Sequence, residues 1–99
     1  MLNKENIEKI NKYFYNKPIE KVYLFGSYAR SEQKENSDID IMLEFEKGSK
    51  ISLIDFSRMK LDLEKILQIP VDLLTEDAIS PYIRPFIMKD IFKIYEKSN

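Results

Sequence analysis

The segment from residue 37 to residue 43, S-D-I-D-I-M-L, constrains the fold more than any other. Successive side chains of a β-strand point to opposite faces, so a strand here places Asp38 and Asp40 on the same face. Ile39 and Ile41 then share the other face and can pack against helices. Two carboxylates on one face repel each other, and Asp has a poor strand propensity. The pattern predicts a sheet that is buried on one side and carries an acidic site on the other.

The spacing of apolar residues predicts that helices alternate with strands in a single domain over residues 1–99. Asn3 is expected to cap the first helix, and a short helical turn is expected at 28–30. Ser80 and Pro81 resemble an N-cap and first helical residue, while Pro85 keeps that helix short or irregular. The predicted elements are a helix at 2–14, strands at 22–25 and 38–45, a helix at 52–68 opened by a Ser52–Asp55 capping box, a strand at 71–74, a helix from 80 and a strand at 91–95. This order predicts an α/β (α+β) fold with helices packed on a small mixed sheet.

Composition limits the chemistry that such a chain can perform. It has no Cys and no His, so thiolate zinc sites, disulfides and His-dependent nucleophile pairs are excluded. A net charge of -1 with scattered Lys and Arg argues against direct nucleic-acid binding. The charged amino terminus is not a signal peptide, and no apolar stretch is long enough for a membrane span, so we expect a cytoplasmic protein. The groups that remain available for catalysis are carboxylates, hydroxyls and cations that bind oxygen ligands.

A third acidic residue stands in the apolar segment P-V-D-L-L. Asp72 faces away from Val71 and Leu73 if this segment is a strand. Divalent cations such as Mg²⁺ are held by one or two carboxylates together with substrate phosphates. Each Asp alone could be an ordinary solvated side chain. Together they favour a metal site formed by Asp38, Asp40 and Asp72.

A Gly-Ser turn precedes the acidic strand. Gly26 and Ser27 follow the apolar run of residues 22–25, and exposed amide groups at such a turn can bind an anion. Arg30 could contact phosphate as well. Gly-Ser alone would favour an ordinary strand-to-helix turn, and a lone Arg is more often a surface charge. The chain has only two glycines, so this is neither a Walker loop nor a dinucleotide-binding loop.

Gly26-Ser27, ten intervening residues and Asp38-Ile39-Asp40 resemble the signature of the nucleotidyltransferase superfamily that includes DNA polymerase β. The segments L-F-G-S-Y-A-R, S-D-I-D-I, V-D-L-L and P-Y-I-R look like the minimal nucleotidyltransferase (MNT) family over residues 18–96. Ser31 departs from the pattern, because many relatives have Gly after the Arg.

The resemblance implies the polymerase β-like fold and transfer of a nucleoside monophosphate, AMP from ATP. Asp38, Asp40 and Asp72 would hold two Mg²⁺ ions, for which Mn²⁺ can substitute, and Asp72 would also orient or deprotonate the acceptor hydroxyl. The nucleotide-binding residues would be Gly26, Ser27, Arg30 and Ser37.

The resemblance also implies a partner. Larger relatives add an acceptor-binding domain for which 99 residues leave no room, so we expect the acceptor on another protein. MNT proteins are paired with HEPN-domain RNase toxins and act as antitoxins, which implies AMP transfer to a toxin tyrosine within a hetero-oligomer. Two alternatives remain open: nucleotidylation of a small molecule of the aminoglycoside type, or neutralisation by binding alone.

Overall fold

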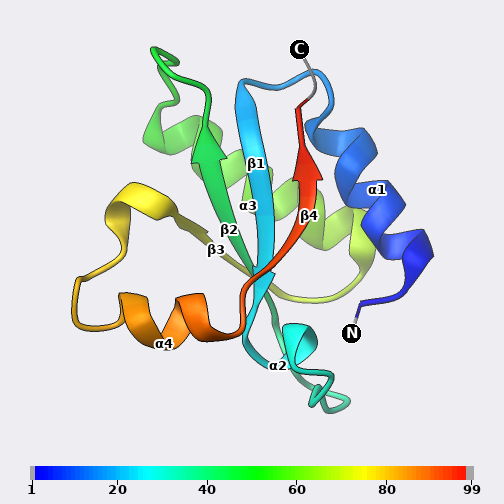
Figure 1. The fold of residues 1–99 in the computed structure, drawn as a ribbon. Coiled ribbons are helices and arrows are strands. Elements are labelled where there is room, and N and C mark those ends of the chain that lie inside the picture. The colour runs from blue at the N-terminus through cyan, green and yellow to red at the C-terminus, as the bar shows by residue number, and fades with distance from the viewer. Residues whose placement is uncertain (1, 98–99) are drawn as a thin grey trace.

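A computed structural model of the chain describes residues 2–97 and has helices packed on a mixed sheet (Figure 1). The sheet has four strands in the order β3-β2-β1-β4. β1 is antiparallel to β2 and β4, whereas β2 and β3 are parallel. The predicted mixed sheet is thereby confirmed. In chain order the elements are α1 (Lys4–Phe14), β1 (Ile19–Phe25), α2 (Gly26–Ala29), β2 (Ile39–Phe45), α3 (Leu53–Leu67), β3 (Val71–Thr75), the 3₁₀ helix η1 (Glu76–Ala78), α4 (Arg84–Lys89) and β4 (Phe92–Glu96).

One face of the sheet packs against α1 and α3 and forms the main core (Figure 1). Ile39 and Ile41 of β2 are fully buried there, as the alternation of the strand requires. Leu63 of α3 is buried in the same core. The hydroxyl of Tyr13 on α1 donates a hydrogen bond of 2.6 Å to the carboxylate of Asp62 on α3. The two helices are therefore joined to each other as well as to the sheet.

The other face of the sheet carries Asp40 and has a thinner cover. Met42, two residues along the same face, is fully buried, and Phe25 is nearly so. Neither belongs to the core under α1 and α3. The segment between β3 and β4, with η1 and α4, runs along this second side (Figure 1). Asp40 is thus next to buried apolar side chains on the sheet face along which this segment runs.

The caps predicted for the first two long helices, α1 and α3, are confirmed. The side-chain oxygen of Asn3 accepts a 2.8 Å hydrogen bond from the backbone N–H of Asn6 at the start of α1. Ser52 and Asp55 form a capping box at the start of α3, with hydrogen bonds of 3.0 and 3.2 Å between each side chain and the other residue's backbone N–H. These bonds pair N–H groups that have no partner within a helix.

The strand boundaries differ in detail from the prediction. β1 begins at Ile19 and not at Val22, because a bulge shifts the β1–β2 register between Ile19 and Lys21. Such an extra residue breaks the period-two pattern and lets Ile19 and Val22, three positions apart, both be fully buried. β2 begins at Ile39, so Asp38 immediately precedes the strand.

The last helix begins later than predicted. α4 starts at Arg84, so the expectation that Ser80 and Pro81 open it is wrong. The carbonyl of Ser80 does accept a 2.9 Å hydrogen bond from the N–H of Arg84, which closes one helical turn. Pro85 has no N–H, so the ladder cannot continue regularly, and α4 is confined to six residues as expected for a short helix. β4 likewise begins at Phe92, one residue after the predicted start.

No helix within residues 2–97 combines the length and apolar character needed to cross a bilayer.

Candidate active site

Asp40 and Asp72 lie side by side on neighbouring strands. The parallel register of β2 and β3 pairs Asp40 with Asp72, just as it pairs Ile39 with Val71. Adjacent strands are about 4.8 Å apart, so two carboxylates that project from paired positions lie within reach of one ion. Asp38 stands two residues before Asp40, at the open end of β2. The structure therefore brings together the acidic residues that the sequence places far apart.

Burial and neighbouring negative charges disfavour the ionised form of Asp40 in the acidic site. The pKa of Asp40 is raised to about 6, first by burial, then by the negative charges of Asp72 and Asp38. Arg30 opposes these effects and lowers the pKa of Asp40. Burial and like charges both disfavour ionisation of a carboxyl group. The site thus holds more negative charge than its protein surroundings neutralise.

Gly26 lies directly against the carboxylate of Asp40. Its φ of +73° is a left-handed conformation, and a Cβ added there would lie 2.1 Å from Oδ2 of Asp40. Any larger residue would have to displace that carboxylate. The preceding residue, Phe25, pairs with Asp40 in the β1–β2 register. The Gly-Ser turn and the acidic strand therefore form one site.

The other predicted nucleotide-binding residues lie around this turn. Ser27 is in α2, directly after Gly26, and its carbonyl accepts a 2.8 Å hydrogen bond from the N–H of Glu32. Arg30 ends α2 and binds the carboxylates of Glu32 at 3.2 Å and Asp90 at 3.5 Å. Ser37 lies in the loop before β2, where its hydroxyl accepts a 2.8 Å hydrogen bond from a backbone N–H. All of them remain candidates for contact with phosphate.

Ser31 adopts the conformation that glycine favours. Its φ is +58°, in the left-handed region. A non-glycine residue in this conformation carries a local cost of about 1 kcal/mol.

The donor set fits a divalent cation that a nucleotide helps to bind. Among residues 2–97, no three acidic side chains form a cluster that could hold an ion by themselves. Mg²⁺ does not need one, because it is usually bound through one or two carboxylates, several waters and substrate phosphates. Asp40 and Asp72 offer such a pair of hard oxygen ligands, and Gly26 leaves the space beside Asp40 open to a ligand.

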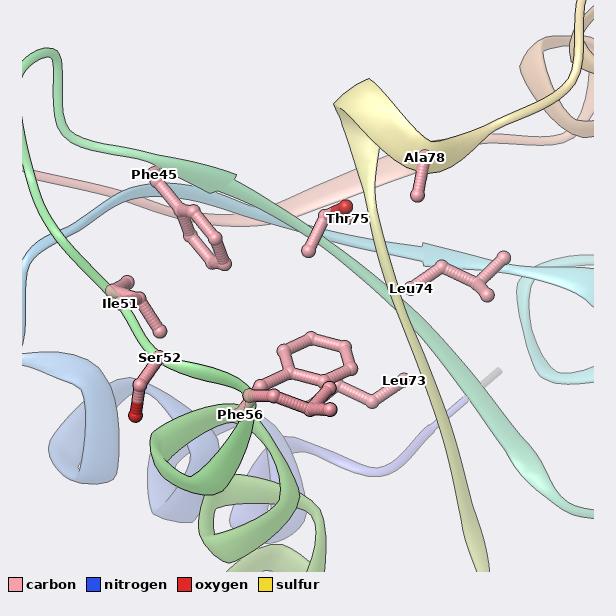
Figure 2. Close-up of a pocket in the computed structure, with 9 residues that line it drawn as sticks. Phe45, Ile51, Ser52, Phe56, Leu73, Leu74, Thr75 and Ala78 are labelled. Atoms are coloured by element: carbon pink, nitrogen blue, oxygen red, sulfur yellow. The ribbon is translucent and has the colours of Figure 1, made fainter.

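The apolar pocket in Figure 2 is not part of this site. It has a volume of about 330 Å³ and lies where β2 and β3 end, whereas Asp40 and Asp72 lie where these strands begin. Apolar side chains dominate its wall, and it offers no acidic ligand for a cation. Its lining residues are Phe45, Ile51, Ser52, Leu53, Phe56, Leu73, Leu74, Thr75 and Ala78.

Comparison with known proteins identifies the family. The family described as nucleotidyltransferase domain matches residues 4–94. The chain belongs to the nucleotidyltransferase domain family. The family resemblance, the fold class and the assignment to an enzyme class are confirmed by this match and by relatives named protein adenylyltransferases.

Individual relatives align with most of this nucleotidyltransferase. MJ1379 of Methanocaldococcus jannaschii, named as a candidate protein adenylyltransferase, is 41% identical over 93 residues, 92% of this chain and 93% of its own. The protein adenylyltransferase MntA of Thermococcus cleftensis is 33% identical over 73 residues, covering 74% and 72% of the two chains. A chain in a crystal structure of a toxin–antitoxin with AMP-PNP superposes with a TM-score of 0.76 at 25% identity, over 98% of this chain and 76% of that one.

Sequence reasoning missed the acidic partners of Arg30. Asp90 is sixty positions away in the chain and lies at the end of α4, so no local spacing connects it to α2. Glu32 is only two residues from Arg30, but both lie in a polar stretch where this spacing does not predict an ion pair. The parallel pairing of Asp40 with Asp72 was likewise visible only in three dimensions.

Proposed function

We propose that this nucleotidyltransferase transfers AMP from ATP to a tyrosine hydroxyl of a HEPN-domain toxin and thereby acts as its antitoxin. The observation that carries the proposal is the pairing of Asp40 with Asp72 beside Gly26, on a chain whose relatives are named protein adenylyltransferases. The reaction class follows from the family, whereas the residue roles, the metal, the acceptor and the partner are part of the proposal.

Asp38, Asp40 and Asp72 would bind two Mg²⁺ ions together with the triphosphate. When bound, the ions supply positive charge that offsets the charge building up on phosphate oxygens during transfer. The need for such charge is apparent in the raised pKa of Asp40, whose carboxyl lacks sufficient compensation within the protein.

The reaction exchanges one phosphoester bond for another. The acceptor oxygen attacks the α-phosphorus of ATP and forms a new P–O bond, while the bond to the β-phosphate oxygen breaks and pyrophosphate leaves. Asp72, exposed at the second position of β3, orients the acceptor hydroxyl and accepts its proton. This assignment needs no histidine, in agreement with the composition.

The Gly-Ser turn would hold the phosphates that leave. Gly26 allows the triphosphate to approach the backbone closely, and Ser27 adds its hydroxyl. Arg30 lies near enough to Asp40 to lower its pKa, so it could also contact a phosphate bound there. Ser37 would act from the loop before β2.

Support for a protein acceptor comes from the relatives. The name of MntA states that it adenylylates protein, and the structure with AMP-PNP is that of a toxin–antitoxin. We carry both features to this chain as part of the proposal, with a cytoplasmic hetero-oligomer of antitoxin and toxin as the assembly.

The test uses the purified chain, α-labelled ATP, Mg²⁺ and the HEPN-domain protein encoded beside its gene. Asp72→Asn should keep most of its affinity for ATP with Mg²⁺ but lose transfer by at least about 100-fold, because it removes an ion ligand and the base. Asp77→Asn, the same change at an exposed carboxylate in η1, is the matched control and should transfer normally. Mass spectrometry locates the added nucleotide.

Wild-type transfer rates in Asp72→Asn would contradict the proposed role of this residue. In cells, Asp72→Asn should still co-purify with the toxin but fail to protect growth. Protection without any modified toxin would mean that neutralisation occurs by binding alone.

A further inference from the structure

Apart from Tyr15 and Phe92, the large exposed apolar side chains of the described residues gather at two helices, α3 and α4, and only α4 is on the catalytic side of the sheet. The first surface is on α3, where Leu53 is 80% and Leu61 is 64% exposed. The second precedes and includes α4, where Tyr82 is 87% and Phe86 is 76% exposed. Patches of this kind on a small protein commonly mark contact sites. The sequence segment P-Y-I-R, which the nucleotide site does not use, lies in the second surface.

Three exposed apolar side chains, those of Tyr82, Ile83 and Phe86, lie at the start of α4, and we call this group the α4 ridge. The N–H of Phe86 donates a 3.0 Å hydrogen bond to the carbonyl of Ile83, so these two residues lie within one turn, and Tyr82 directly precedes Ile83. Ile83 is 54% exposed. Ile87 and Met88, further along α4, are partly buried. The start of the helix therefore presents apolar side chains to solvent.

Ion pairs hold both ends of α4 on the sheet face that carries Asp40. At its start, Arg84 binds the carboxylate of Glu76 at 2.9 Å. Glu76 also lies close enough to Glu44 to raise the pKa of that carboxyl, and the side chain of Glu44 projects from β2 on the same face as Asp40, four residues away. The start of the ridge is thus anchored above the catalytic face.

The end of α4 is anchored at the nucleotide turn. Asp90, the residue after α4, binds Arg30 at 3.5 Å. β4 then begins with Phe92, which pairs with Leu24 of β1, one row from the pair of Phe25 and Asp40. Figure 1 shows α4 beside α2, at the end of the sheet where β2 begins. The end of α4 therefore lies beside the nucleotide turn, and the ridge is at the other end of the same short helix.

The α3 surface lies on the wrong side for an acceptor. α3 packs through Met59 and Leu63 on the core under Ile39 and Ile41, which point away from Asp40. A protein bound to the outer side of α3 would be separated from the carboxylates by the helix and the sheet. Of the two surfaces, only the ridge can hold a protein whose hydroxyl reaches Asp72.

We propose that the α4 ridge is the docking surface for the acceptor protein, which inserts an apolar patch against Tyr82, Ile83 and Phe86 while its hydroxyl enters the acidic site. This inference rests on the proposed function and adds the surface that selects the acceptor. Exposed aromatic side chains at the centre of a contact commonly dominate its binding energy. Two aromatic rings and an isoleucine fit a partner that offers an apolar patch, and they offer little to a small polycationic acceptor.

The experiment compares two double variants that remove equal numbers of exposed apolar side chains. Tyr82→Ala with Phe86→Ala should weaken binding of the neighbouring gene's HEPN-domain protein by at least about tenfold and raise the KM for this acceptor. ATP affinity and the rate at saturating acceptor should stay within about twofold. Leu53→Ala with Leu61→Ala is the control and should leave all of these quantities unchanged. Circular dichroism and thermal melting check that both variants fold.

A second measurement, photo-cross-linking, does not depend on shortening side chains to Ala. Phe86→p-benzoylphenylalanine should cross-link the acceptor protein on irradiation, and Leu61→p-benzoylphenylalanine should not. Unchanged acceptor binding in the ridge variant, equal loss in the α3 variant, or cross-linking from position 61 alone would overturn the inference. Acceptor binding is measured without nucleotide, so this measurement tests the ridge independently of AMP transfer. If the wild-type protein transfers no AMP, only the proposed function is rejected.

Discussion

At the scale of single residues, the site depends on how closely Gly26 and Asp40 approach each other. The Gly-Ser spacing and the acidic strand were sufficient to predict that both residues belong to one site. They could not predict that the glycine lies directly against the carboxylate, because that distance depends on the pairing of β1 with β2. The left-handed conformation of Ser31 was likewise not predictable from its residue type, which is one that rarely adopts it.

Replacing Gly26 should separate steric conflict from backbone strain. Gly26→Ala places a Cβ 2.1 Å from Asp40 in a left-handed conformation, whereas Gly48→Ala meets nothing within 4 Å at a similar φ of +82°. Gly48→Ala should cost about 1 kcal/mol of unfolding free energy from the left-handed backbone alone. Gly26→Ala should cost about 1 to 3 kcal/mol more through overpacking, and displacement of Asp40 should reduce transfer on the order of 100-fold. Urea denaturation and transfer assays measure the two effects, and equal stability of the two variants would contradict the close contact.

At the scale of elements, periodicity predicted the helices and strands well where the backbone is regular and less well where it is not. Because of the bulge in β1, Ile19 does not fit the period-two pattern, and the predicted strand started too late. Pro85 interrupts the helical hydrogen bonds, so α4 starts at Arg84 and not at Ser80. The 3₁₀ helix η1 was not predicted, because three polar and small residues carry no periodic signal. Caps, by contrast, depend only on residues within one turn, and the caps predicted for α1 and α3 formed, whereas Ser80 does not cap α4.

The capping box of α3 should contribute to stability without affecting the chemistry. Ser52→Ala removes the acceptor for the N–H of Asp55 and should lower the unfolding free energy by about 1 kcal/mol. Ser57→Ala, an exposed position within the same helix, is the control and should change it by less than about 0.5 kcal/mol. ATP affinity, measured by calorimetry, should be equal in both variants. A loss of ATP affinity in Ser52→Ala alone would mean that α3 positions the nucleotide.

At the scale of the whole molecule, the acidic site lowers the stability of the metal-free fold. The pKa of Asp40 rises from 3.8 in its ordinary state to about 6 in the fold, so folding favours its protonated form. The contribution of Asp40 to the unfolding free energy is therefore fully favourable below about pH 4 and is lost as the pH rises through 6. Because the carboxyl is partly exposed to solvent, the loss should be smaller than the roughly 1.4 kcal/mol per pKa unit of an unscreened group.

The prediction is that Asp40→Asn removes this part of the pH dependence. In EDTA, urea denaturation of the wild type should give an unfolding free energy that falls between pH 4 and pH 7 relative to the variant. The variant should be equally stable or more stable at pH 7, yet inactive. Glu8→Gln, an exposed change on α1 on the other side of the sheet, should keep the wild-type profile. Parallel pH profiles for Asp40→Asn and the wild type would show that Asp40 ionises normally in the fold.

The parallel pairing of β2 with β3 also has a consequence for synthesis on the ribosome. Parallel neighbours need a crossover connection, here α3, so Asp72 cannot reach Asp40 until that helix has emerged and packed. The antiparallel β1–β2 pair, with Gly26 and Asp40, can form earlier from a shorter stretch of chain. A nascent chain that stalls before β3 would therefore present the turn and one part of the acidic site without the other. The emergence and packing of β3 thus determine when the acidic pair can first form.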